Sequence, residues 1–118
     1  MKATNYDRVF NYTFALIYPL YVTKIEKKGR TIEELNKVIE WLTGYDSKKL
    51  KEIIDSKITL KQFFNNANIN PNSSKITGLI CGVRVEYIED KLMQQIRYMD
   101  KIVDELAKGK SLEKIMRE

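Results

Sequence analysis

The chain has 118 residues, of which 43% are hydrophobic and 31% charged, a composition that excludes a disordered chain and fits one folded domain. It has no histidine and one cysteine, which excludes imidazole catalysis and an intrachain disulfide, so neither a metal nor a cofactor is predicted. The net charge is +5, and the longest apolar run, at 14–22, is shorter than the roughly 18 residues that cross a bilayer, so we expect a cytoplasmic protein without membrane contact.

The first 30 residues predict one helix, with clear signals for its beginning and its end. Pro19 suits the first turn of a helix, where its missing N–H does no harm, and Gly29 suits the position just past the helix end. Before this helix, the aromatic stretch at 9–17 predicts either a short helix or an extended segment. Residues 1–12 could therefore be an arm packed on the core.

Two capping boxes mark the starts of later helices. Thr31 with Glu34 begins a helix whose apolar residues repeat at spacings of three and four up to Gly44. Thr59 with Gln62 repeats the same pattern before a shorter helix. Another short helix is predicted between these two.

A polar stretch at 65–74, rich in Asn and Ser around Pro71, predicts the main surface loop. Apolar residues then follow at helical spacing: Ile76, Leu79, Ile80 and Val83. They predict a fifth helix that ends near Gly82. Cys81 lies in this stripe, and without a histidine to act as its base it is expected to be a small buried apolar residue rather than a nucleophile.

The longest predicted helix covers 88–107, where apolar residues step by four and three until Gly109. Ser111 can cap a short terminal helix within 110–118. The seam of about two heptads along the long helix could pack in the core, or it could form a homodimer through the Ile88 to Ala107 helix. The predicted fold is all-α: a single helical domain over 1–118, built as a compact bundle of six or seven helices with one long C-terminal helix.

Residues 59–78 have some features of a helix-turn-helix. Thr59 opens a helix, and Ser74 with Lys75 leads into the predicted fifth helix. However, Asn68 occupies the turn position that commonly takes glycine, and few basic residues nearby could contact phosphate. Nucleic-acid binding through a degenerate helix-turn-helix is therefore an alternative that the sequence does not favour.

Most of the net positive charge lies in the first 30 residues. Lys24, Lys27, Lys28 and Arg30 could form a patch that binds anions or faces a nucleic acid. The simpler interpretation is that cations in the last turn of a helix stabilise its dipole, by about 0.3 to 1 kcal/mol each. The sequence favours this second interpretation.

Two arginines are candidate ligand-binding residues, because a guanidinium group can hold a carboxylate or phosphate with two hydrogen bonds. They are Arg84, with Glu86 close by in the sequence, and Arg97 on the long helix. Tyr18 and Tyr21 are expected at the edge of the core, where they could border the same pocket. No catalytic residue is assigned.

Several short motifs occur in order along the chain. They are YPLYV at 18–22, KGRT at 28–31, WLTGY at 41–45, ITG at 76–78 with CGVRVE at 81–86, and IRY at 96–98 with DK at 100–101. From about residue 12 to residue 115 the chain resembles a prokaryotic family, the domain-of-unknown-function family 2200. The resemblance implies a compact, stand-alone cytosolic domain. It implies no activity, cofactor or catalytic residue.

The function predicted is a non-catalytic binding or interaction module. The alternatives are the degenerate helix-turn-helix protein and an enzyme of unknown reaction with an arginine-lined small-molecule pocket. A concave pocket that joins Arg84 or Arg97 with aromatic residues would indicate a small ligand. A large exposed apolar patch would indicate a protein partner.

Overall fold

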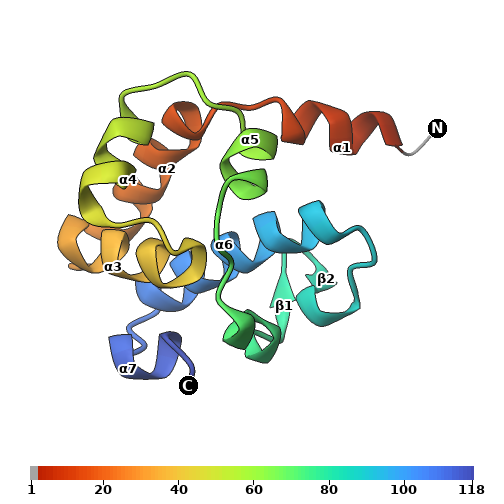
Figure 1. Ribbon diagram of the computed structural model, residues 1–118. Helices are drawn as coiled ribbons and strands as arrows, with labels where there is room; N and C mark the ends of the chain where they lie inside the picture. Colours follow the sequence, from red (N-terminus) through yellow and green to blue (C-terminus); the bar gives the residue numbers. More distant parts are fainter. Residues whose placement is uncertain (1–2) are drawn as a thin grey trace.

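The longest helix, α6 (Lys91–Ala107), runs through the middle of the molecule (Figure 1). The computed structural model describes residues 3–118, and within this range α6 packs against helices from both halves of the sequence. Its apolar side chains are buried in the shared core, among them Ile96, Met99, Ile102, Val103 and Leu106. The apolar residues of the predicted seam therefore pack in the core of the same chain. This packing explains the seam without a second copy of the protein.

The remaining helices and strands surround α6. The helices are α1 (Ala3–Phe10), α2 (Phe14–Glu26), α3 (Ile32–Thr43), α4 (Ser47–Ile54), α5 (Leu60–Asn65) and α7 (Leu112–Ile115). The short elements are the 3-10 helices η1 (Pro71–Lys75) and η2 (Val85–Tyr87) and the strands β1 (Leu79–Ile80) and β2 (Val83–Arg84). The prediction of an all-α bundle of six or seven helices is confirmed. None of the helices within residues 3–118 has both the length and the hydropathy that a membrane-spanning helix needs.

The predicted capping boxes are confirmed. The hydroxyl of Thr31 accepts a hydrogen bond from the N–H of Glu34, whose carboxylate accepts one from the N–H of Thr31 at 3.0 Å. Thr59 and Gln62 exchange the same pair of bonds at the start of α5. Gly44 ends α3 with a φ of 76°, in the left-handed region that favours glycine.

The start of α2 differs from the prediction. The hydroxyl of Thr13 accepts a hydrogen bond from the N–H of Leu16 at 3.1 Å, so the helix begins at Phe14 and Pro19 lies inside it. Pro19 is exposed, and the helix tolerates the loss of one backbone hydrogen bond there. The N–H of Phe14 donates to the carbonyl of Ile58 at 2.9 Å, which ties the start of α2 to the chain before α5.

Helix α1 projects from the body of the molecule (Figure 1). It touches α5, and the rings of its residues Tyr6 and Phe10 lie with their centroids 6.0 Å apart. The arm considered for residues 1–12 is thus helical over most of its length, while residues 1–2 lie outside the described part of the chain.

The prediction of a fifth helix at 76–82 is wrong, because residues 79–84 form a β-hairpin. The two strands run antiparallel, with Leu79 opposite Arg84 and Ile80 opposite Val83. The turn residues Cys81 and Gly82 both have positive φ, at 52° and 82°, as a two-residue type I′ turn requires. No helix other than η1 lies between α5 and the hairpin, so the helix-turn-helix interpretation is also wrong.

Candidate functional site

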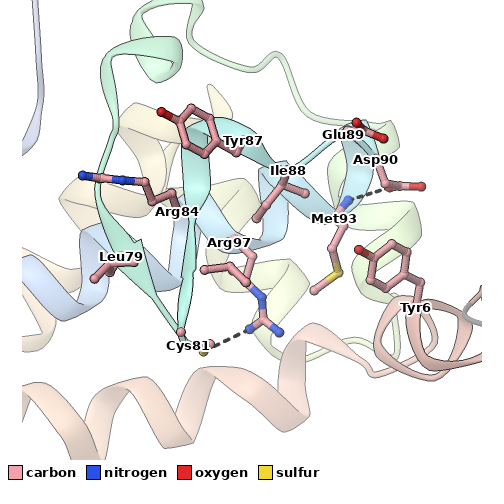
Figure 2. Close-up of a pocket in the computed structure, with 12 residues that line it drawn as sticks. Tyr6, Leu79, Cys81, Arg84, Tyr87, Ile88, Glu89, Asp90, Met93 and Arg97 are labelled. Atoms are coloured by element: carbon pink, nitrogen blue, oxygen red, sulfur yellow. Dashed lines mark hydrogen bonds between the residues drawn. The ribbon is translucent and has the colours of Figure 1, made fainter.

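A cleft of about 1010 Å³ lies between the hairpin, the beginning of α6 and helix α1 (Figure 2). The hairpin turn forms one wall, and Tyr6 of α1 stands at the opposite side. The segment 87–90, which joins η2 to α6, closes the end of the cleft. The cleft is therefore formed by one continuous segment, 79–97, together with Tyr6, which is distant from it in sequence.

One face of α6 supplies the floor of the cleft. Asp90, Met93 and Arg97 are spaced three and four residues apart, so their side chains lie in a row along the helix. Asp90 also caps α6, because its Oδ1 atom accepts a hydrogen bond from the N–H of Met93 at 2.8 Å. Met93 is only 3% exposed, yet it lies outside the main hydrophobic cluster of the protein. Figure 2 shows it between Arg97 and Asp90.

The rim of the cleft is apolar and exposed to solvent. Tyr87 is 75% exposed and Leu79 is 62% exposed, and Val83 and Tyr6 are exposed as well. Such side chains would lose contact with water if a ligand with apolar groups covered them, and this burial is worth about 25 cal/mol per Å². The rim is therefore suited to an apolar part of a ligand.

Arg97 brings a positive charge to the floor of the cleft. Its Nη1 atom donates to Oδ2 of Asp100 at 2.8 Å and to the Sγ atom of Cys81 at 3.4 Å. The Nε and Nη2 atoms have no hydrogen-bond partner among the described residues, and the side chain is 25% exposed. The guanidinium group therefore has N–H donors left for an anion.

Asp100 holds this arginine in place with the help of Tyr21. The Tyr21 hydroxyl donates a hydrogen bond to Oδ1 of Asp100, while Oδ2 accepts from Arg97. Burial and the charge of Asp100 raise the pKa of Tyr21 well above its usual value, so the hydroxyl keeps its proton and remains a donor. The orientation of Arg97 is thus fixed from below by a side chain of α2.

Glu86 stabilises the hairpin instead of lining the cleft. Its Oε1 atom accepts a hydrogen bond from the N–H of Gly78 at 2.9 Å, and Oε2 lies 3.5 Å from Nη1 of Arg84. The hydrogen bond from Gly78 is the largest cause that lowers the pKa of Glu86. Gly78 also accepts a bond from the N–H of Val85 at 2.9 Å, so these contacts close the base of the hairpin.

Residues 8–117 match a family described as an uncharacterized protein conserved in bacteria (DUF2200). The chain belongs to this family. The resemblance noted in the sequence is thereby confirmed. A crystal structure of the uncharacterized protein SP1917 is similar, with a TM-score of 0.87 and 42% sequence identity over 92% of this chain and 90% of that one. No curated protein matches the chain.

In this DUF2200 chain, the structure brings together only some of the residues predicted to bind a ligand. Arg84 and Arg97 both line the cleft, although Figure 2 shows the Arg84 guanidinium pointing away from Arg97. Tyr21 lies beneath the cleft through its bond to Asp100. Tyr18 does not take part, because its hydroxyl donates to Oδ1 of Asn36 on α3.

The structure also corrects the expectation that Cys81 is buried. Cys81 is exposed at the turn of the hairpin, with its sulfur atom next to Arg97. The prediction failed because it placed Cys81 on the apolar face of a helix, whereas turn residues of a hairpin face solvent. Sequence reasoning also missed Tyr6, Tyr87 and Met93, which only the fold brings to the cleft.

The predicted basic patch of the DUF2200 chain is divided by internal contacts. Lys24 lies 3.2 Å from a carboxylate oxygen of Asp104, and Arg30 lies 2.9 Å from Glu34. Arg30 also donates to two backbone carbonyls near the end of α6, and its bond to Glu34 lowers the pKa of that carboxyl group to about 2. Lys27 and Lys28 have no ion pair among the described residues, and both are exposed, as is Lys24. These contacts favour a structural role for the other two cations.

Proposed function

We propose that this protein is a non-catalytic binding module whose cleft takes a small ligand with an anionic group and an apolar part. The observation that carries the proposal is the position of Arg97. Its guanidinium group is held by Asp100, keeps unused N–H donors, and lies among exposed apolar side chains. A guanidinium in such surroundings binds a carboxylate or a phosphate more strongly than it would in open water.

The chemistry of the cleft supports binding rather than catalysis. The Cys81 thiol is a potential nucleophile, but its hydrogen-bond neighbour is Arg97, a cation that cannot accept a proton. Tyr21 keeps its proton and is engaged with Asp100, so it is not a general base. As part of the same proposal we assign the protein to the cytoplasm, where a single unpaired cysteine stays reduced.

The first prediction concerns Arg97→Gln. N-acetylleucine, which has a carboxylate and an apolar side chain but no amine, should bind the wild-type protein and raise its melting temperature. The variant should bind N-acetylleucine at least about tenfold more weakly, because it loses a charge-assisted hydrogen bond. Titration calorimetry measures this difference, and circular dichroism shows whether the variant stays folded.

Lys27→Gln is the matched control for this experiment. Lys27 is exposed and is not among the residues that line the cleft, and its replacement removes the same charge. We expect its affinity for N-acetylleucine to equal that of the wild-type protein. Equal affinity of the Arg97 variant and the wild type, or a loss caused by the Lys27 variant instead, would contradict the proposed function.

A further inference from the structure

The two ends of the cleft carry opposite charges, and we infer that its ligand is a short apolar peptide with both ends free, about three residues long. The peptide carboxylate would bind at Arg97, and its ammonium group at Glu89 and Asp90. This inference rests on the proposed function and deepens it, because it names the class of ligand. It follows from the spacing of charges on α6 and from the residues between them.

The charged residues lie on the same face of α6 at a defined separation. Asp90 caps the helix and Arg97 is seven positions further along, so at a rise of 1.5 Å per residue their backbone positions are about 10 Å apart along the helix axis. Figure 2 shows Glu89 next to Asp90 at one end of the cleft and Arg97 at the other. An anion and a cation of one ligand can therefore be held at the same time if they are separated by a similar distance.

An extended peptide has charges at this separation. Its backbone advances about 3.3 Å per residue, so the terminal ammonium and carboxylate of a tripeptide lie about 10 Å apart. A single amino acid is too short to reach both ends, and a longer peptide would have to bend. The distance thus favours three residues.

The acidic end has capacity left for a cation. Glu89 is exposed and forms no ion pair among the described residues. Asp90 uses Oδ1 for the N–H of Met93, and its Oδ2 atom has no partner among the same residues. An ammonium group at this end could donate hydrogen bonds to both carboxylates without disturbing the cap of α6.

The middle of the cleft is suited to apolar peptide side chains. Met93 forms the floor between the charged ends, and its flexible thioether adapts to side chains of different shape. Leu79 and Tyr87 on the rim are largely exposed and would be covered by such side chains. The cleft should therefore discriminate by the charged ends and the length of a peptide more than by its exact side chains.

The test is titration calorimetry with trileucine and its blocked forms. Free trileucine should bind at least about tenfold more tightly than N-acetyltrileucine, which lacks the ammonium group, and than trileucine amide, which lacks the carboxylate. Free leucine, which cannot span the cleft, should also bind more weakly. Equal affinities for the free and N-acetylated tripeptides would overturn the inference.

A double variant, Glu89→Gln with Asp90→Asn, removes the negative charge and keeps the cap, since asparagine caps helices as well as aspartate does. It should weaken the binding of free trileucine about tenfold and leave that of N-acetyltrileucine unchanged. Glu113→Gln, an exposed acidic residue on α7, is the matched control and should change neither affinity.

The outcomes separate this inference from the proposed function. If N-acetylleucine and N-acetyltrileucine bind through Arg97 but blocking the amine has no effect, the inference is overturned and the proposed function stands. If none of these compounds binds to the wild-type protein, both are overturned. If the double variant weakens the binding of free and N-acetylated trileucine equally, Glu89 and Asp90 do not bind the ammonium group, and the inference fails.

Discussion

Replacing Gly44 with alanine should lower the free energy of unfolding by about 3 kcal/mol. The alanine backbone would be strained at this position, and the added Cβ atom would also clash with backbone atoms nearby. Gly44 has a φ of 76°, a conformation that alanine adopts with difficulty. A Cβ at this position would lie 2.8 Å from the carbonyl oxygen of Asn68. That segment cannot move away freely, since the N–H of Asn68 donates to the carbonyl of Thr43 at 2.8 Å.

Gly29→Ala separates the two causes of this loss. Gly29 has a similar φ of 80°, but a Cβ there would meet no atom within 4 Å. The free energy of unfolding of this control should therefore fall only by the cost of the left-handed backbone conformation, about 1 to 2 kcal/mol. Urea unfolding of both variants measures the difference, and equal losses would show that the chain at Asn68 does not pack against Gly44 as described.

Phe63→Ala should be still more destabilising, by about 3 to 5 kcal/mol, because it leaves a cavity in the largest aromatic cluster of the core. The Phe63 ring is fully buried and stacks on Phe14, with ring centroids 4.3 Å apart. It also meets the edge of the Phe64 ring at 4.9 Å. Since a domain of this size is stable by only about 5 to 15 kcal/mol, this loss would be a large part of its free energy of unfolding.

Leu20→Ala is the control for the loss of an apolar side chain. Leu20 lies on α2 and is 63% exposed, so its truncation should change the free energy of unfolding by less than about 0.5 kcal/mol. Thermal and urea unfolding give both values. A loss below about 1 kcal/mol for the Phe63 variant would mean that α2 and α5 do not pack through these rings.

Helix boundaries that depend on local hydrogen bonds could be predicted from the sequence. Thr31 and Thr59 cap their helices through bonds that span three residues, and Ser111 caps α7 in the same way. Gly44 was correctly placed at the end of α3, because a left-handed residue is needed there. These signals require no knowledge of the remaining fold.

The hairpin could not be predicted by the same reasoning. The apolar spacing of 76–83 fits a helix, but the positive φ angles of Gly78 and Gly82 interrupt it and leave strands of only two residues. The alternation of Val83 and Val85 was too short to indicate a strand. The conformation of this segment depends instead on contacts with α6, such as the hydrogen bond that Gln94 Nε2 donates to the carbonyl of Val85 at 3.1 Å.

The candidate site was predictable only in part. Arg84 and Arg97 were identified because their chemistry suits anion binding, whereas Tyr6 and Tyr87 reach the cleft through the path of the whole chain. The row of Asp90, Met93 and Arg97 was a signal that the sequence contained. The spacing of these residues places all three on one face of the helix. However, only the structure shows that the opposite charges at the two ends of the row border a cleft.

The central claim is that ligands bind in the cleft between the hairpin, α6 and α1, and chemical-shift mapping tests it most directly. Isotope-labelled protein would be titrated with N-acetylleucine while its backbone amide signals are followed. We predict the largest shifts for Tyr6 and for residues 79–97, with little change in α3, α4 and α7. Shifts centred on residues 24–30, or no shifts at millimolar concentration, would contradict the claim.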